Sequence, residues 1–376
     1  MFDILTNNTL SRAELNYEDG TYKNIHYGDV LIKFPAHIDV ENKEVPFVNE
    51  DSSSSKFDDA LLQDGDIVIA DTAEDYTVGK ATEIENTAML KVVSGLHTIP
   101  CRPKMKFAAR YLGYYINSLA YHNQLIPYIQ GVKVSSISKT LIKNTSISYP
   151  SYGEQSKIAE FFSALDSKIE TQNKIISDLK VLKKELCNKV FRSFKCVRLG
   201  DYIEEITTRN RSNDCDNVLS VSNKSGFVKQ SEQFEDRTIA SEDKRNYKVV
   251  TMGCFAYNPA RINVGSIALL SSDTKGIISP MYVCFKTKQG LSAEYLNYYY
   301  QSGFFFKELQ KRLEGSVRQC LTYENMCDMQ IPFAKVERQE EIAHTLKRFA
   351  CLIEKEERHL KLLQKQKAYF LNAMFI

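Results

Sequence analysis

Two stretches of the 376-residue chain carry a long helical pattern of apolar residues. In residues 158–190 and again in 342–374, apolar side chains recur in alternating steps of four and three, with no Gly or Pro between them. This spacing is the a/d pattern of helices that pack along a common seam. It predicts two long spacer helices, at 151–194 and 334–376. The seam positions we single out are Leu165, Ile169, Ile176, Leu179, Leu186, Phe349, Ile353, Leu360, Leu363 and Phe370.

Polar residues interrupt this seam at matching places. Gln172 and Lys183 in the first stretch correspond to Glu356 and Lys367 in the second, each 184 residues later. Such residues can fix the register of a helix pair. Drift at tolerant positions would leave the same pattern, so both interpretations stay open.

The regions before the helices, 1–150 and 195–333, have a different pattern. Short β-rich runs alternate with Gly, Pro, Asn and Ser, and a shorter helical patch follows. The runs include Asp66–Ala70 and Ile277–Phe285, and the patches are Ala108–Tyr121 and Ala293–Leu309. Ser151 and Glu154 have the spacing of a capping box, which predicts the start of the first long helix. We expect one mixed α/β domain in front of each helix.

The two halves repeat one another. Tyr111-Leu-Gly-Tyr-Tyr115 recurs as Tyr295-Leu-Asn-Tyr-Tyr299, and Gln155 recurs as Gln339, both at an offset of 184. Residues 65–70 resemble residues 253–258 at an offset of 188. A nearly constant offset over a long stretch indicates two copies of one structural unit.

The short linkers predict how the helices run. A helix over residues 158–190 would be roughly 50 Å long, whereas a domain of this size has a radius of gyration of roughly 15 Å. The second domain starts just after the first helix and ends just before the second. Only an antiparallel pair brings those two points together, with one domain at each end and Met1 near Ile376.

Composition excludes several classes. The chain is 26% charged and 43% hydrophobic, which is typical of a soluble protein. It has no long apolar run and no basic, apolar leader, so we expect a cytoplasmic protein without membrane contact. Nine cysteines without a C-x-x-C pair and six scattered histidines favour reduced thiols and no metal site.

The net charge of +2 divides into about −5 for residues 1–150, +1 for 151–191, and +3 each for 192–333 and 334–376. Charge alone therefore does not indicate nucleic acid.

Two similar modules at a fixed separation suit DNA half-sites, and the layout resembles the specificity subunit of type I restriction–modification systems. The resemblance covers nearly the whole chain. It rests on Val197-Arg-Leu-Gly-Asp201, Gly65-Asp66-Ile67, Gln130-Gly131-Val132 with Ile137-Ser138, and on Pro150, Glu154-Gln155 and Ile158-Ala159 with their repeats Pro332, Arg338-Gln339 and Ile342-Ala343.

The resemblance implies an α/β fold in which two globular target-recognition domains are separated by two antiparallel coiled-coil helices, with an internal pseudo-two-fold repeat. It implies a double-stranded DNA target read in two halves across a helix-set spacer. Implied partners are two methylation subunits, which bind S-adenosylmethionine and methylate adenine, and restriction/translocation subunits, which use ATP and Mg²⁺. The chain would have no cofactor of its own, and the resemblance implies a cytoplasmic (prokaryotic) protein. It departs from the pattern at its start: Met1–Thr6 resembles Ile203–Thr207, so no counterpart of Val197–Asp201 precedes it.

Catalytic motifs are missing, which fits a non-catalytic subunit. A DNA-adenine methyltransferase needs a Gly-rich cofactor loop and an Asn/Asp-Pro-Pro-aromatic clamp, and Asn258-Pro-Ala-Arg261 is only a partial match. No phosphate-binding G-x-x-x-x-G-K-[ST] loop occurs. Glu242-Asp-Lys244 has the E-x-K spacing of a nuclease site, with Asp236 as its acidic partner, but such short triplets are common. Self-sufficient nuclease or methyltransferase activity is therefore a weak alternative. The stronger one is a coiled-coil adaptor whose two heads bind proteins, suggested by the acidic first domain.

Sequence reading needs Arg or Lys on guanine and Asn or Gln on adenine. Our candidates in the second domain are Arg209, Asn210, Arg211, Lys244, Arg245, Asn258, Arg261, Asn263 and Arg318. Those in the first domain are Lys33, Lys56, Tyr76, Lys80, Ser94, His97 and Lys133. A solvated surface loop would explain each of them equally well. The tyrosines at 111–115 and 295–300 could stack on bases, but aromatic residues at helical spacing are more often core.

Overall fold

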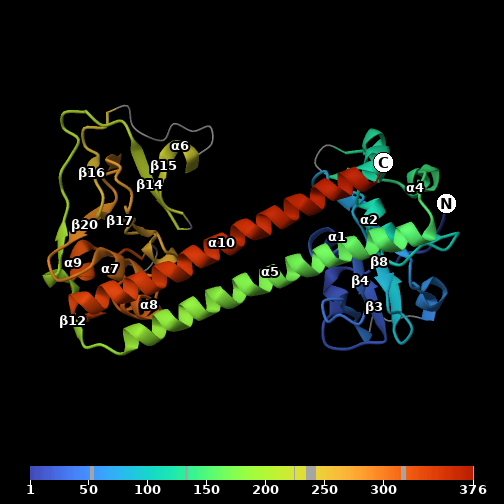
Figure 1. Ribbon diagram of the computed structural model, residues 1–376, viewed down its shortest axis with the longest axis horizontal. Coiled ribbons are helices and arrows are strands. Elements are labelled where there is room, and N and C mark those ends of the chain that lie inside the picture. Colours follow the sequence, from blue (N-terminus) through green and yellow to red (C-terminus); the bar gives the residue numbers. More distant parts are fainter. Residues whose placement is uncertain (51–54, 132–133, 224, 234–242, 315–318, 376) are drawn as a thin grey trace. The chain divides into compact units, whose positions relative to one another are not determined.

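A computed structural model describes residues 1–50, 55–131, 134–223, 225–233, 243–314 and 319–375 (Figure 1). The chain divides into two compact units, Met1–Asn173 with Arg358–Ile376, and Lys174–Glu357, called unit 1 and unit 2 below. Each unit holds a globular α/β domain and one segment of each of two long helices, α5 (Tyr152–Arg192) and α10 (Val336–Met374).

The described part of unit 1 is built on two main sheets. One has the strand order β1-β10-β6-β8-β4 and the other β2-β5-β3-β9, and β7 pairs with β11. The strands are β1 (Phe2–Ile4), β2 (Leu15–Asn16), β3 (Tyr22–Ile25), β4 (His37–Asp39), β5 (Phe47–Val48), β6 (Ile67–Ala70), β7 (Thr72–Ala73), β8 (Ala81–Glu85), β9 (Lys91–Ser94), β10 (Thr98–Pro103) and β11 (Ser135–Ser136). The short helices are α1 (Tyr27–Ile32), α2 (Tyr111–Ile116), α3 (Leu119–Leu125) and α4 (Lys139–Asn144).

The described part of unit 2 also has two main sheets, with orders β13-β20-β17-β18 and β15-β14-β19-β16, and β12 pairs with β21. Its strands are β12 (Cys196–Arg198), β13 (Ile203–Glu205), β14 (Val218–Ser222), β15 (Gly226–Lys229), β16 (Lys248–Val250), β17 (Phe255–Tyr257), β18 (Ile267–Leu269), β19 (Gly276–Ile278), β20 (Val283–Thr287) and β21 (Gln330–Pro332). Its helices are α6 (Gln230–Gln233), α7 (Ala293–Tyr299), α8 (Gly303–Gln310) and α9 (Tyr323–Cys327).

The first sheets of the two units share their layout. Strands β1, β10, β6 and β8 stand in the same order, all antiparallel to their neighbours, as β13, β20, β17 and β18. Gly65 and Gly253 precede β6 and β17 with the same φ of 85°, a conformation that glycine adopts without steric cost. The two matching sequence runs therefore have matching backbone conformations.

Buried tyrosines form the contact between each domain and the long helices. In unit 1 the ring of Phe375, near the end of α10, lies 5.7 Å from that of Tyr111 and 5.5 Å from that of Tyr115. In unit 2 Phe191, near the end of α5, lies 5.1 Å from Tyr295 and 5.7 Å from Tyr299. All four tyrosines are buried, which agrees with a core role and removes them as base-stacking candidates.

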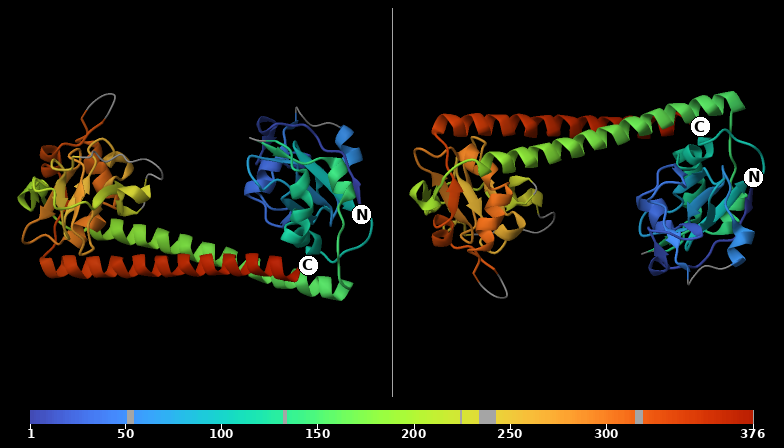
Figure 2. Two further views of the ribbon diagram at one scale, coloured as in Figure 1. Left: turned by 90° about the horizontal axis from the view of Figure 1, so that it is seen from above. Right: turned by 90° about the horizontal axis from the view of Figure 1, so that it is seen from below.

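Within each unit the two helix segments run antiparallel. The helix ribbons are drawn in Figure 2. In unit 1 Phe162 of α5 stacks on Phe375, and Asp166, one turn later, pairs with Lys367, which comes earlier in α10. In unit 2 the end of α5 and the start of α10 share one apolar cluster, and Lys180 Nζ lies 2.7 Å from Glu357 Oε1.

The side chains at the seam positions are buried or half-buried from solvent. Leu165, Ile176 and Ile353 are buried, and the other seven seam candidates are half-buried. The two interrupting lysines make matching contacts, because Lys183 lies over the ring of Tyr298 at 5.5 Å and Lys367 over that of Tyr114 at 5.6 Å. Drift alone does not explain these equivalent contacts.

Several local expectations are refined. The helical patch 108–121 is two helices, α2 and α3, because Ser118 bonds the Tyr115 carbonyl and starts a new helix. Residues 293–309 break in the same way at Ser302. The run 277–285 is two strands, β19 and β20. The Glu154 half of the expected capping box is present: the Ser151 backbone N–H donates to Glu154 Oε2 at 3.1 Å, and α5 begins at Tyr152. Among the described residues no helix is long and apolar enough to cross a bilayer.

Candidate nucleic-acid interface

One edge of the first sheet of unit 2 gathers the candidate loops. Strands β13 and β17 both run antiparallel to β20, so they are parallel to each other and their carboxyl ends meet the same edge. The loops after β13 and after β17 therefore leave the sheet on either side of the start of β20, about 10 Å apart at ordinary strand spacing. These loops hold residues 207–212 and 258–265.

The third candidate segment joins the first. Arg209 donates to Asn246 Oδ1 at 3.0 Å, and the backbone of Asn210 donates to the Tyr247 carbonyl at 2.9 Å. Arg209, Arg211 and Arg245 are exposed. The fold thus brings Arg209 and Asn246, 37 residues apart in sequence, onto one surface. On that surface Arg245 Nε lies 3.6 Å from Asp243 Oδ1.

The loop after β17 presents its cation to solvent. Arg261 and Asn263 are exposed, and Ile262 between them is fully buried and anchors the loop. Gly265, with φ 90°, ends the short helical turn Ile262–Val264. Arg261 therefore projects from a loop that packing holds in place.

Two asparagines have a different role from the one expected. Asn210 is 4% exposed, and its side chain bonds both the backbone N–H and the carbonyl of Cys215. Asn258 is 6% exposed, and its Oδ1 accepts from the Ala260 N–H at 3.0 Å. These amides shape their own loops, because local bonds to the backbone use the groups that a base would need. Lys244 is half-buried and paired with Asp216 at 2.8 Å.

The equivalent edge of unit 1 lies at the ends of β1 and β6, on either side of the start of β10. His97 stands directly before β10, with Nδ1 3.4 Å from Asp71 Oδ1. Tyr76, 86% exposed, lies between β7 and β8, in the connection that follows β6. This loop corresponds to the one that carries Arg261 in unit 2.

Three other candidates in unit 1 are committed to local contacts. Ser94 is fully buried and bonds Thr98, so it positions the turn and does not face a ligand. Lys80 Nζ donates to the Leu31 carbonyl at 2.8 Å, and burial lowers its pKa. Lys33 is exposed at the end of α1, where its hydrogen bond to the Tyr17 hydroxyl raises its pKa. Lys33 alone of these three keeps its charged group at the surface.

The remaining candidates lie outside the described residues. These are Lys133 and Arg318, the side chain of Lys56, and Asp236 and Glu242 of the nuclease-like triplet. Sequence reasoning also missed Met281, which is 58% exposed. It lies just before β20, between the two loops of the unit 2 edge, and only the strand pairing reveals this placement.

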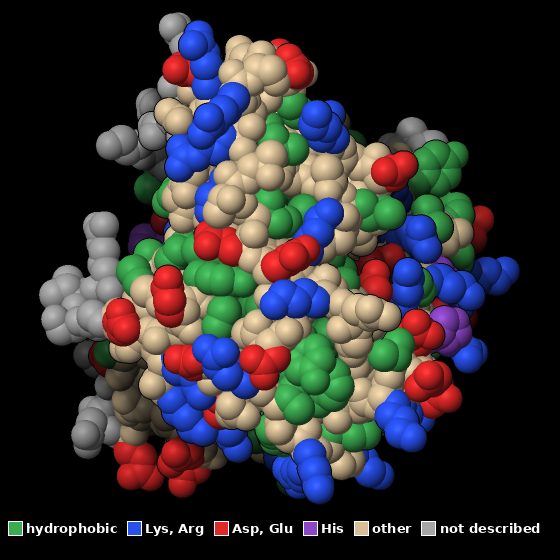
Figure 3. All heavy atoms as spheres, turned by 90° about the vertical axis from the view of Figure 1, so that its left-hand side faces the viewer, with side chains coloured by type: hydrophobic (Ala, Val, Ile, Leu, Met, Phe, Trp, Pro, Cys, Tyr) green, Lys and Arg blue, Asp and Glu red, His purple; other side chains and the backbone are tan. Residues whose placement is uncertain are grey.

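Charge on the outer face of unit 2 is mixed. Figure 3 shows the face that lies at the left of Figure 1, where Lys and Arg side chains alternate with Asp, Glu and apolar side chains. A candidate interface must therefore be identified from the loops at the sheet edge, because overall charge does not mark it.

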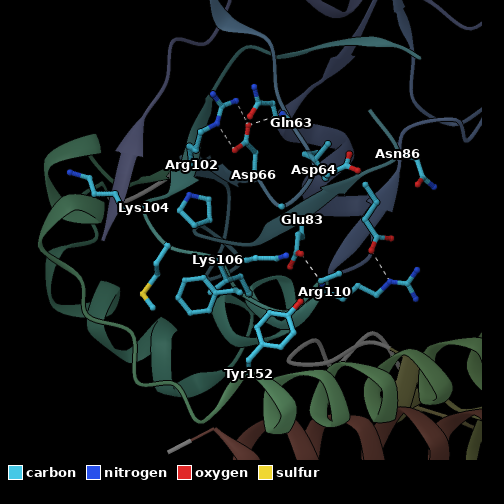
Figure 4. Close-up of a pocket in the computed structure, with 18 residues that line it drawn as sticks. Gln63, Asp64, Asp66, Glu83, Asn86, Arg102, Lys104, Lys106, Arg110 and Tyr152 are labelled. Carbon is cyan, nitrogen blue, oxygen red and sulfur yellow. Dashed lines mark hydrogen bonds and ion pairs between the residues drawn. The ribbon is translucent and has the colours of Figure 1, made fainter. Parts of the chain in front are cut away.

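A hollow of about 650 Å³ lies elsewhere in unit 1, between β8, the end of β10 and the start of α2 (Figure 4). Both of its arginines are paired with carboxylates of the lining. Arg102 makes two bonds to Asp66, and Arg110 pairs with Glu85 at 2.7 Å. Buried Glu83 accepts the backbone N–H groups of Arg110 and Gly113 at 2.6 and 2.8 Å. This is the arrangement of a structural network. The described residues contain no cluster of three His, Cys, Asp or Glu suited to a metal ion.

Comparison with known proteins gives the family. Residues 1–181 match the model described as "Type I restriction modification DNA specificity domain". Residues 1–181 therefore belong to the type I restriction–modification specificity family. The specificity subunit of the type I restriction enzyme MjaVIII from Methanocaldococcus jannaschii is 26% identical over 278 residues, which cover 65% of this chain and 64% of that protein, just under two thirds of its length.

Two solved structures share the fold of this chain. The S subunit of the type I system of M. genitalium matches it with a TM-score of 0.54 and 13% identity, over 100% of this chain and 94% of the other. A chain from a study of "complex assembly" and "conformational transition of the type I R-M system" matches with a TM-score of 0.58 and 15% identity, over 95% and 93%. At these identities the likeness concerns the mixed α/β fold.

Proposed function

We propose that this chain is the DNA-specificity subunit of a type I restriction–modification complex and reads a bipartite target with one domain per half-site. Residues 1–150 and 195–333 are the two target-recognition domains in this proposal. The observation that carries it is the recurrence of one arrangement: in each unit, exposed polar loops leave the equivalent edge of the first sheet, on either side of the start of β10 in unit 1 and of β20 in unit 2. Two equivalent reading edges in one chain suit a target with two halves.

The side chains proposed to read bases in unit 2 are those that the loops hold exposed. Arg209, Arg211, Arg245 and Arg261 can each donate to guanine, and Met281 offers an apolar contact for a thymine methyl group. In unit 1 the corresponding groups are Tyr76, His97 and Lys33. Lys133 and Arg318 remain candidates for phosphate contacts.

We infer that the long helices 151–194 and 334–376 set the spacer and hold the partner subunits. The seam packing supports this, because it buries one face of each helix and leaves the other faces exposed to solvent. Phe161, Ile175, Val181, Leu352 and Tyr369 are between 37% and 66% exposed. Two methylation subunits and the restriction/translocation subunits are the proposed partners. They would supply S-adenosylmethionine, ATP and Mg²⁺, and this chain would be non-catalytic.

The test is co-expression with the cognate methylation subunit, followed by mapping of methylated adenines across the host genome. We expect a split motif with a constant gap. A contiguous motif would mean that only one domain reads DNA, which contradicts the two-domain proposal. Absence of modified adenine, with the complex assembled, would favour the protein-binding adaptor.

A further inference from the structure

One loop is closed in the same way in both units. In unit 1 it joins β6 to β8 and contains the short strand β7, and in unit 2 it joins β17 to β18. We call them the β6–β8 loop and the β17–β18 loop. The Ala70 N–H donates to the Lys80 carbonyl at 2.9 Å, and the Asn258 N–H donates to the Ser266 carbonyl at 3.1 Å. One backbone bond thus ties the two ends of each loop together.

A second backbone bond fixes the first residue of each loop. The Ile137 N–H donates to the Asp71 carbonyl at 2.9 Å, and the Leu321 N–H donates to the Pro259 carbonyl at 3.1 Å. Ile137 and Leu321 are 184 residues apart, which is the offset of the sequence repeat. The two loops are therefore held by equivalent parts of their units.

The ends of the two loops are matched as well. Gly79 has a φ of 91° and Gly265 a φ of 90°, and each lies two residues before the next strand. Shortly before each glycine a fully buried aliphatic side chain, Val78 or Ile262, anchors the loop in the core of its unit. With equivalent frames, the loops differ in function through the side chains that they expose.

The charged side chains of the two loops have opposite hydrogen-bonding character. The β17–β18 loop exposes Arg261, which only donates. The β6–β8 loop exposes residues 74–77, which contain two carboxylates and no Lys or Arg. Asp75 Oδ1 accepts the Thr77 N–H at 2.9 Å, so this carboxylate shapes its own turn. In the part of the chain that the structure describes, the Glu74 carboxylate has no hydrogen bond or ion pair.

An unpaired carboxylate at this edge favours a hydrogen-bond donor on DNA. Phosphate oxygens are negatively charged acceptors, so they repel Glu74. In the major groove cytosine presents its N4 amino group, from which Glu and Asp accept, whereas guanine presents the two acceptors that Arg binds. Adenine also has an amino group, but its N7 acceptor lies beside it and faces a carboxylate unfavourably. Cytosine therefore fits Glu74 best.

We propose that Glu74 is a specificity-determining residue of unit 1 and accepts a hydrogen bond from the N4 amino group of a cytosine in the first half-site, the half-site read by unit 1. This role rests on the proposed function. It gives the two loops opposite tasks, because the β6–β8 loop accepts from cytosine while the β17–β18 loop donates to guanine through Arg261.

A cation beside the loop offsets the repulsion between Glu74 and the DNA backbone. Lys139 is exposed and lies two residues after Ile137, which holds the first residue of the loop. Its Nζ lies 2.9 Å from Oδ1 of Asn7, which follows β1 at the same edge of the sheet. Lys139 is thus placed to contact a phosphate group near the base that Glu74 reads.

The first test maps methylated adenines for the full chain and for Glu74→Gln, each co-expressed with the cognate methylation subunit. The half-site that Arg261→Ala relaxes belongs to unit 2, which identifies the first half-site. We expect a C·G pair there, and Glu74→Gln should lower the preference for it about tenfold or more and favour adenine, because Gln binds adenine through two hydrogen bonds. The second half-site should be unchanged.

Glu44→Gln is the matched control. Glu44 is exposed in the turn after β4, and β4 ends at the opposite edge of the sheet because it runs antiparallel to β6. A first half-site without a C·G pair, or an unchanged preference in Glu74→Gln, would overturn the role of Glu74.

The second test removes the other partner of the contact. A duplex in which pyrimidin-2-one replaces the cytosine lacks only the N4 amino group. It should bind the unmodified complex about tenfold or more weakly, and Glu74→Ala should cause a similar loss on the natural duplex. The two changes together should cost no more than either alone, whereas losses that multiply would refute a direct contact.

Failure of the proposed function has a different signature. The unmodified chain would then give no split motif, and the role of Glu74 would fall with it. If the role of Glu74 alone is wrong, the split motif persists and Glu74→Gln gives the same motif as the unmodified chain.

Discussion

At the scale of single residues, an ionisable group in unit 1 is held where its charge is unfavourable. Burial of Glu83 raises its pKa to about 7, although the N–H groups of Gly113 and Arg110 oppose this shift. The folded protein therefore binds a proton in a range where the unfolded chain has lost it. Such a group links folding of unit 1 to pH.

We predict that stability falls as pH rises from about 4.5 to about 7 and is level above that, because only the folded state holds the Glu83 proton in this window. The full effect is at most roughly 3 kcal/mol. Glu83→Gln should flatten this slope in thermal unfolding followed by circular dichroism at pH 5 to 8. Glu160→Gln, at an exposed position of α5, is the control. An unchanged slope in Glu83→Gln would disprove the role of Glu83.

We predict that Arg261 contributes to the recognition of one DNA half-site. Its side chain is exposed on a loop held by buried Ile262, so Arg261→Ala should remove a base contact without unfolding unit 2. We expect about 10- to 100-fold lower affinity for the cognate half-site. The other half-site and the gap should be unchanged in selection from a random duplex library. Arg338→Ala, an exposed arginine of α10 paired with Glu341, is the matched control. Equal loss in both half-sites would contradict one domain per half.

At the scale of elements, each domain depends on the end of a long helix that follows the other domain in sequence. Phe375 lies in the core of unit 1 and Phe191 in that of unit 2. Each helix begins after one domain and ends in the core of the other. Fragments cut between the domains would separate these parts.

Phe375→Ala should therefore destabilise unit 1 by about 3–5 kcal/mol, the usual cost of removing a buried phenylalanine. Hydrogen exchange should speed up in α2 and stay unchanged in α7, while Phe191→Ala should do the reverse. Tyr369→Ala, 66% exposed on α10, should have little effect on either helix. Faster exchange in both units from a single substitution would refute this division.

At the scale of the whole molecule, the proposed spacer is set by helix length. Deleting residues 170–176 and 354–360 removes one heptad from each helix and preserves the seam pattern. Seven residues of α-helix span about 10.5 Å, so the preferred gap should shorten by about three base pairs, at roughly 3.4 Å each. The methylated motif of the variant measures this directly. Deletion from α5 alone breaks the register and should abolish assembly; a double deletion with an unchanged gap would exclude helix length as the determinant.

The sequence by itself determined the long helices, their seam and the correspondence of the two halves. Their signals are local and periodic: Ser151 and Glu154 mark the start of α5, and the seam recurs every three or four residues. The sequence also limited the candidate DNA-contacting loops to a few polar segments. It did not separate the asparagines that bind their own backbone, such as Asn210 and Asn258, from exposed residues such as Arg261, because both types sit in similar polar loops.

Tertiary structure decided what depends on partners far apart in sequence. The meeting of residues 207–212 with 244–248 follows from strand pairing, as does the position of Met281 beside them. Neither has a sequence signature, because a hydrogen bond between distant strands is set by backbone position and leaves the side chains at its ends unconstrained.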